Sequence, residues 1–181
     1  MSLKQSGSLL VALCAVVALG ASATASASTQ LAPPAPSTST PALAVNDQGQ
    51  AVAAWRAELV DGILTAVQAS FFDGRTWSAP TPLSGFGTSG TVKTAIDGAG
   101  RAYVAWTSSL DGGATERSPL YISSFAGTGW SSPQLVQATS TPVSHGELIW
   151  DLAADEAGNF ALLTQRCTCN GIGSLDVRIG R

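Results

Sequence analysis

The chain is 181 residues long and carries 9 Lys and Arg residues against 12 Asp and Glu residues, for a formal net charge of −3. The charges are scattered, with no basic stripe. This disfavours binding to nucleic acid or to an anionic membrane, because both depend on clustered Lys and Arg. Strand-forming and turn-forming residues dominate, and no long segment has helical periodicity.

The N-terminal segment has the pattern of a secretory signal. Lys4 is followed by the apolar run Leu9 to Leu19 and then by small residues with Ala-x-Ala steps. The run is too short to span a bilayer, which takes about 20 residues. We therefore expect a signal peptide over residues 1–27, release to the extracellular space and no membrane anchor. Residues 28–41, rich in Pro, Ser and Thr, predict an extended linker.

The rest of the chain, residues 42–181, contains an internal repeat. The stretch LAVNDQGQAVAAW recurs as TAIDGAGRAYVAW and, more weakly, as LAADEAGNFALLT. The glycines of the three copies lie 51 and 58 residues apart, and the first two copies end in tryptophan. The residues concerned are Gly49, Gly100, Gly158, Trp55 and Trp106. Repeats of this length are typical of propeller blades, which have four strands each.

The loop in each copy resembles a metal-binding segment at first sight, but a tight turn explains it better. The loops read NDQG, DGAG and DEAG. Asn or Asp at the first position can hydrogen-bond the turn backbone, and Gly at the last position tolerates positive φ. None of the loops has the alternating oxygen ligands and distal Glu of a calcium loop. We predict three hairpin turns and no metal site.

A second motif follows the first in two copies. FFDGRTWSAP, from Phe71 to Pro80, matches SFAGTGWSSP, from Ser124 to Pro133. The coincidences include two pairs of residues that shape hairpins and pack on sheets, Gly74 with Gly127 and Trp77 with Trp130. Their spacing after the first motif is the same to within a few residues, which supports a true repeat.

Together the motifs predict four antiparallel strands in each repeat. In the first repeat we expect strands at 42–45, 50–58, 64–72 and 76–83. The predicted fold is all-β, with propeller-type blades at about 42–84 and 91–137 and a partial blade at 148–181. Because closed propellers use four to eight blades, the chain predicts an incomplete or open propeller. Truncation of a longer chain, assembly with other copies and an open stack all remain possible, and we favour truncation.

The second motif resembles the Asp-box hairpin of bacterial-neuraminidase-repeat (sialidase-like) propellers, which reads roughly Ser-x-Asp-x-Gly-x-Thr-Trp. Four positions of the first copy match: Ser70, Gly74, Thr76 and Trp77. Phe72 stands where the box has its aspartate, and Phe125 takes that place in the second copy. The resemblance implies blade architecture with degenerate boxes.

The catalytic set that this resemblance implies cannot be placed on the chain. Sialidases need an arginine triad, a Tyr nucleophile with a Glu partner, and an Asp acid. The sequence has only two tyrosines, Tyr103 and Tyr121. Arg56, Arg117 and Arg166 follow the second strands but match no arginine signature. We predict no catalytic residue, and a sialidase-like glycoside hydrolase fragment or inactive relative is the alternative.

Two short motifs fit known sites but have simpler explanations. GFGTSG, from Gly85 to Gly90, fits the G-x-G-x-x-G pattern, but a strand follows it rather than a helix, so we expect a flexible link between blades. Cys167 and Cys169 predict a disulfide, either with each other or between chains, and free thiols are the alternative. Metal binding needs more ligands, and His145 is the only histidine.

Other chemically active residues near the third repeat are isolated. His145 and Asp151 lack the G-x-S-x-G elbow that a catalytic triad on this pattern needs. Glu147 and Asp151 are four apart, so on a regular strand both would lie on one face, where paired carboxylates can hydrolyse glycosides. The first repeat has no acidic counterpart, so we expect neither pair to be catalytic. Trp150 also has no counterpart, and it is a candidate platform for a sugar ring.

These observations predict a secreted blade-repeat protein that is not an enzyme and takes no cofactor. The recurring tryptophans are expected to pack between sheets. The binding surface would take a glycan or a cell-surface protein, and exposed blade edges would favour self-association.

Overall fold

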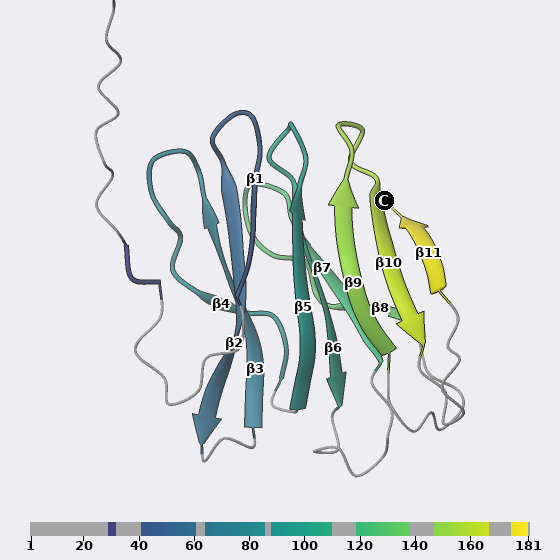
Figure 1. Ribbon diagram of the computed structural model, residues 1–181. Helices are drawn as coiled ribbons and strands as arrows, with labels where there is room; N and C mark the ends of the chain where they lie inside the picture. The colour runs from purple at the N-terminus through teal and green to yellow at the C-terminus, as the bar shows by residue number, and fades with distance from the viewer. Residues whose placement is uncertain are drawn as a thin grey trace, which may run out of the picture.

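The computed structural model describes residues 29–31, 41–60, 64–85, 88–109, 119–137, 147–166 and 175–180. These residues form eleven β-strands in three antiparallel sheets, with no helix among them (Figure 1). The predicted all-β class with antiparallel sheets is confirmed. Among the described residues, none belongs to a helix with the length and hydropathy that a membrane span requires. The predicted signal segment lies outside the described residues.

Each sheet is a meander in which strands adjacent in the chain are also adjacent in space. The first sheet contains β1 (Ala42–Val45), β2 (Ala51–Val60), β3 (Leu64–Phe72) and β4 (Thr81–Pro82). The second sheet contains β5 (Thr88–Ile96), β6 (Ala102–Ser109), β7 (Leu120–Phe125) and β8 (Gln134–Gln137). The third sheet contains β9 (Glu147–Ala154), β10 (Phe160–Arg166) and β11 (Leu175–Gly180).

The fourth strand of the first sheet is much shorter than the predicted 76–83. Only β4 pairs with β3, after a single bridge between Phe72 and Trp77. Between them the Ser78 hydroxyl accepts a hydrogen bond from the Phe71 amide at 3.0 Å and so replaces a ladder bond. Pro80 adds a residue without an N–H group. The side chain of Ser78 and the proline therefore interrupt the strand that the repeat pattern predicted.

The three sheets pack face to face and bury two apolar clusters. One cluster lies between the first and second sheets and includes Val52, Val67 and Trp106. The other lies between the second and third sheets and includes Tyr103 and Leu162. Because strand residues alternate between faces, Trp106 and Tyr103 project from opposite faces of β6. The second sheet is therefore buried on both faces, and β6 is apolar along most of its length.

The hairpin loops within the first motif are stabilised by their own side chains. The side-chain carbonyl oxygen of Asn46 accepts hydrogen bonds from the backbone amides of Gln48 and Gln50 at 3.1 and 2.9 Å. Asp97 accepts two such bonds in the second sheet, at 3.0 and 2.7 Å. Gly49 ends its turn at a φ of 74°, which favours glycine. The first position of each loop thus serves the turn.

Neighbouring loops are also linked to one another. The Asn46 side-chain amide donates to the Asp97 carbonyl at 2.9 Å, which ties the first loop to the second. The Tyr103 hydroxyl donates to the Gly158 carbonyl at 2.6 Å, which ties the second sheet to the third loop. These bonds fix the order of the three sheets at the loop end, shown at the top of Figure 1.

Candidate functional site

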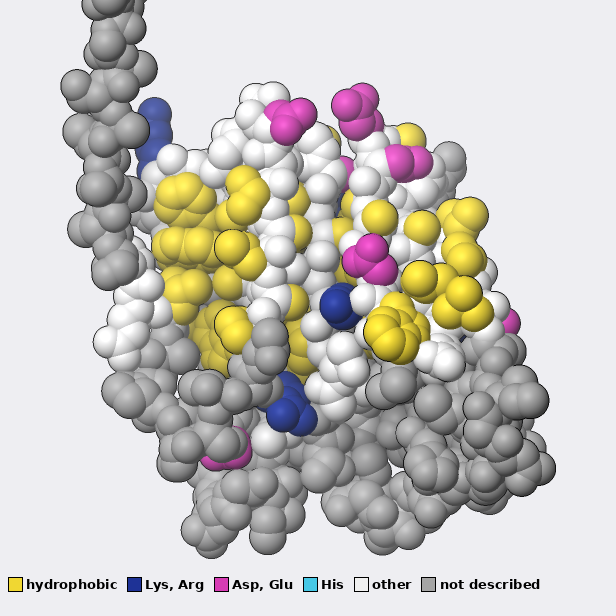
Figure 2. All heavy atoms as spheres, viewed as in Figure 1, with side chains coloured by type: hydrophobic (Ala, Val, Ile, Leu, Met, Phe, Trp, Pro, Cys, Tyr) yellow, Lys and Arg dark blue, Asp and Glu magenta, His cyan; other side chains and the backbone are white. Residues whose placement is uncertain are grey.

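A groove of about 690 Å³ runs beside the first strands of the three sheets. Strands β1, β5 and β9 are neighbours in space, and each contributes to the lining. The lining residues come from Pro41 to Leu43, Arg56, Gly90 to Thr94, and Asp151. On this face of the molecule, basic and acidic side chains lie close together between apolar areas over the first and third sheets (Figure 2).

One position of the repeat lines the groove in all three sheets. Ala42, Lys93 and Asp151 each lie seven residues before the glycine of their copy. Their side chains differ completely, so the alignment of shared residues did not single out Lys93. The position of Lys93 in the repeat could have identified it, because residues at equivalent positions of equivalent strands face the same side. The repeat therefore places a neutral, a basic and an acidic side chain along one line.

The groove contains two cationic side chains from different sheets. Arg56 comes from β2 and Lys93 from β5, and both are half-buried. A guanidinium group offers planar paired donors, and an ammonium group adds a compact charge. Together they favour a ligand with a carboxylate or several oxygens over an apolar ligand. Of the three arginines considered for a triad, Arg56 alone is placed in the groove, because Arg117 and the side chain of Arg166 lie outside the described residues.

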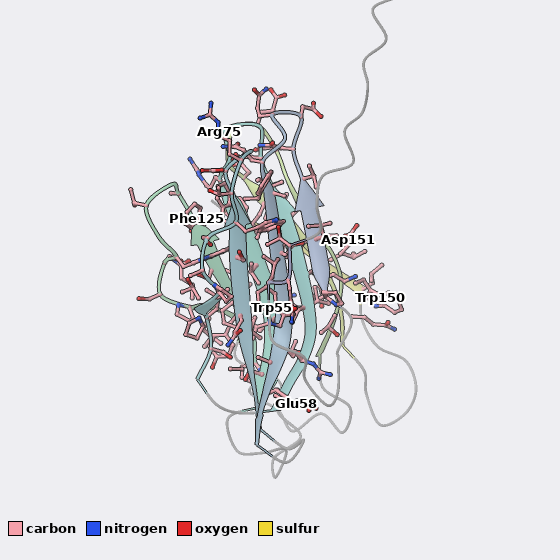
Figure 3. All side chains as sticks on the ribbon, turned by 90° about the vertical axis from the view of Figure 1, so that its left-hand side faces the viewer. Trp55, Glu58, Arg75, Phe125, Trp150 and Asp151 are labelled. Carbon is pink, nitrogen blue, oxygen red and sulfur yellow. The ribbon has the colours of Figure 1, made fainter. Side chains whose placement is uncertain are left out.

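Trp150 lies beside the groove on a β-bulge. Asp151 pairs with Leu163 and Ile149 with Thr164, so Trp150 is an extra residue in β9. The bulge turns both Trp150 and Asp151 outward (Figure 3). Trp150 is 54% exposed, and its indole N–H donates to the side-chain oxygen of Gln165 at 2.8 Å. The ring is therefore both accessible and held in one orientation.

The bulge corrects the prediction that Glu147 and Asp151 lie on the same face. Four residues preserve the face only on a regular strand, and the extra residue at Trp150 breaks the alternation between them. The spacing argument for a pair of catalytic carboxylates therefore fails. Asp151 also accepts a hydrogen bond from the amide of Leu152 at 2.9 Å.

Both tyrosines belong to the packing between sheets. Tyr103 is 2% exposed, and its ring lies against Phe160 with centroids 5.5 Å apart. Tyr121 stacks on Trp106 with centroids 5.9 Å apart. Neither lines the groove. Their environments match structural roles and give no support to a nucleophile.

The recurring tryptophans do not all have the same environment. Trp106 is 1% exposed in the cluster between the first and second sheets. Trp130 is half-buried against the same cluster and lies against Phe125 with centroids 5.4 Å apart. Trp77 has the equivalent contact with Phe72 at 5.2 Å, and Trp55 is half-buried on β2.

The glycine-rich stretch from Gly85 to Gly90 is only partly a link between sheets. Residues 88–90 already belong to β5, and Thr88 and Ser89 pair with Ser109 and Ser108. A side chain at Gly90 would collide with the Thr107 hydroxyl, so glycine is needed for close approach of the two strands. His145, Cys167 and Cys169 lie outside the described residues, and so the disulfide remains a prediction.

No protein-family model matches the chain, and no curated protein matches it. Among solved structures, the chain is similar to the Hadza microbial sialidase Hz136, with a TM-score of 0.56 and 15% identity over 78% of this chain and 34% of that one. A protein of unknown function from Dyadobacter fermentans has a TM-score of 0.50 and 12% identity, over 79% and 51% of the two chains. A fucose lectin from Kordia zhangzhouensis, solved with methyl-fucoside, has a TM-score of 0.42 and 11% identity, over 78% and 97%.

At these identities the likeness concerns the fold. The chain spans about a third of the sialidase and about half of the Dyadobacter fermentans protein. The likeness to part of a sialidase agrees, at this coarse level, with the resemblance carried by the hairpin motif. It places no catalytic residue on this chain.

Proposed function

We propose that the chain is a secreted glycan-binding protein without enzymatic activity, whose three sheets are propeller-type blades. The observation that carries this proposal is the groove lined by Arg56, Lys93 and Asp151, with the exposed ring of Trp150 on the residue before Asp151. Secretion is supported by the signal pattern over residues 1–27. The blade architecture is supported by the repeat and by the fold likeness to part of a sialidase.

The groove has the chemical features that a sugar requires. A sugar ring has a face of C–H groups and a rim of hydroxyls. The C–H face can pack against the ring of Trp150, which the hydrogen bond to Gln165 holds in place, because an aromatic ring offers a large apolar surface. The hydroxyls can donate to Asp151 and accept from Arg56 and Lys93. A volume of about 690 Å³ lies in the range of small-ligand sites.

The two cations further favour a sugar that carries a carboxylate. Lys93 and Arg56 both line the groove, and a carboxylate that contacts both would gain charge-assisted hydrogen bonds from each. A neutral sugar would gain only the ring contact and bonds to its hydroxyls. We therefore expect uronic or sialic acid glycans to bind more tightly than their neutral counterparts.

Binding without catalysis is the better-supported function for this groove. A retaining glycosidase of the common type needs two carboxyl groups about 5 Å apart, and among the described residues Asp151 is the single carboxylate in the lining. The packed tyrosines supply no nucleophile there. A sialidase-like hydrolase or an inactive relative is the second candidate, and the fold likeness alone favours it.

The test is a glycan array followed by calorimetry on the protein purified after expression of the full sequence. Lys93→Ala should weaken binding of an acidic glycan by about tenfold, which corresponds to about 1.4 kcal/mol. Trp150→Ala should weaken acidic and neutral glycans alike. Arg75→Ala is the matched control, because Arg75 is an exposed cation on a distant hairpin (Figure 3).

Two results would contradict the proposal. Equal losses for Lys93→Ala and Arg75→Ala would mean that general charge, and not the groove, attracts the glycan. Turnover of a fluorogenic sialoside that disappears in Asp151→Asn would establish the hydrolase instead.

A further inference from the structure

The third sheet has an uncovered apolar face. Leu175, Val177 and Ile179 lie at alternate positions of β11 and are 65%, 65% and 78% exposed. Beside them on β10 are Leu163 and Ala161, which pair with Val177 and Ile179. These five residues are called the outer face of the third sheet. Contiguous exposed apolar surfaces of this kind mark interaction sites.

The equivalent face of the second sheet is buried within the chain. Leu120 pairs with Thr107, which is seven residues after Gly100. Leu175 pairs with Gln165, which is seven residues after Gly158, so the two leucines occupy the same position of the repeat. Leu120 is fully buried in the cluster that the second sheet forms with the third. The repeat therefore places an apolar row on this face, and the following sheet covers it.

The first sheet has exposed apolar side chains on its opposite face, along β1. Leu43 and Val45 of β1 are 64% and 61% exposed, and Trp55 of β2 lies near the middle of this side of the molecule (Figure 3). Counting from each glycine, Val45 corresponds to Ile96 and Trp55 to Trp106. Both of these residues of the second sheet pack against the first sheet. Leu43, Val45 and Trp55 are called the outer face of the first sheet.

We propose that the outer face of the third sheet docks on the outer face of the first sheet of a second copy of this chain. Each face has the side-chain positions that already form an interface inside the molecule, once between the first and second sheets and once between the second and third. The contact between copies continues that established stacking. It joins two different surfaces, so it is heterologous and leads to a closed ring or an open filament.

The same stacking step would extend the groove. Strand β5 lies beside β1, and β9 lies beside β5. One further step brings β1 of the second copy beside β9. Asp151 pairs with Leu163, and Leu163 pairs with Val177, so Asp151 lies on the same face of the third sheet as the row on β11. Leu43 and Asp151 therefore belong both to the groove and to the docking faces, whereas Val45 and Val177, whose variants test docking, lie outside the groove lining.

The test measures the mass of the purified protein by analytical ultracentrifugation over a range of concentrations. The unaltered protein should self-associate. Val177→Asp and Val45→Asp should each raise the dissociation constant at least tenfold, because each buries a carboxylate in one half of the contact. Leu135→Asp is the matched control, since Leu135 is 53% exposed on β8, outside both outer faces. Circular dichroism checks that all three variants retain the fold.

Mixing the variants tests the head-to-tail geometry. Val177→Asp keeps an intact outer face on its first sheet, and Val45→Asp keeps one on its third sheet. An equimolar mixture should therefore form heterodimers that neither variant forms alone. A monomer at every concentration overturns the proposal. So does an oligomer that Val177→Asp disrupts and Val45→Asp leaves intact, because that result indicates a symmetric contact between third sheets.

Discussion

The second and third sheets are built on the same repeat but have different neighbours. In the second sheet, β6 carries Tyr103 and Ala105 on the face toward the third sheet, and both are buried. In the third sheet, the equivalent residues of β10 are Ala161 and Leu163, which are half-buried on the outer face. The second and third strands pair in the same register in the two sheets. The difference shows that the repeat specifies a sheet, whereas burial depends on what lies beside it.

The comparison also shows how one repeat compensates for a change of side-chain size. In the second sheet, Ala102 of β6 pairs with Phe125 of β7. In the third sheet, Phe160 and Gly180 occupy the same two positions and pair with each other. The large side chain has moved to the neighbouring strand, and glycine has made room for it. Phe160 can then pack against Tyr103 across the sheets.

The sharpest test of this difference in burial compares two leucines at one repeat position. Leu120→Ala should lower the free energy of unfolding by about 2–5 kcal/mol, because it leaves a cavity between two sheets. Leu175→Ala should change it by less than about 0.5 kcal/mol, because Leu175 is mostly exposed. Urea denaturation of dilute protein measures both values for the monomer.

The control is to repeat the urea denaturation at a high protein concentration. If copies stack as proposed, Leu175→Ala becomes destabilising at high concentration, whereas the cost of Leu120→Ala stays the same. Equal costs at low concentration would show that the third sheet is covered in the monomer, and the comparison between the sheets would then be wrong.

Because Phe160 and Gly180 replace the small and large side chains of the second sheet, a substitution at Gly180 should also cost stability, but less than Leu120→Ala. A methyl group there would overlap the ring of Phe160, which is 9% exposed and held against Tyr103. Gly180→Ala should therefore destabilise the protein by about 1–3 kcal/mol in thermal or urea unfolding. Gly129→Ala is the matched control, because the space around Gly129 is open and its φ is ordinary. Similar effects at the two glycines would mean that the third sheet has no special packing at this pair.

Local patterns allowed most of the strands to be predicted from the sequence. Strands 42–45 and 64–72 have the predicted bounds, because a polar turn with glycine follows each of them. The strand predicted at 76–83 was too long, since Ser78 uses its side chain in place of a backbone ladder bond. The pairing of Ser78 with Phe71 is a property of the folded hairpin. The equivalent bond forms between Ser131 and the Ser124 amide, so the serine that both copies share is the trace it leaves in the sequence.

The candidate site was harder to predict than the fold. Trp150 was identified as a possible sugar platform because it has no counterpart in the other repeats. Lys93 was missed, because it matches neither Ala42 nor Asp151 in chemistry and only its position recurs. The bulge that turns Asp151 outward could not be predicted, since it depends on how β9 pairs with β10.

The smallest effect that we predict separates the loops of the second and third sheets. Asp97 is 2% exposed in its loop, whereas the equivalent Asp155 is exposed. The side-chain amide of Asn159 donates to Asp155 at 2.7 Å, and this bond, with support from backbone amides, holds the pKa of Asp155 below its ordinary value of 3.8. A lowered pKa in the folded state means that the bond stabilises the fold above the ordinary pKa. This contribution is lost as the pH falls through the lowered value.

Asn159→Ala should therefore raise the pKa of Asp155 toward 3.8 in an NMR titration of its carboxyl carbon. The variant should also lose less stability than the unaltered protein between pH 4 and the lowered pKa, because it has less of this contribution to lose. Gln48→Ala, in the loop of the first sheet, is the control and should leave the titration of Asp155 unchanged. An unchanged pKa in Asn159→Ala would show that the backbone amides alone hold the charge. The exposed third loop would then need only backbone donors, like the buried loop at Asp97, where one carboxylate oxygen accepts hydrogen bonds from two backbone amides.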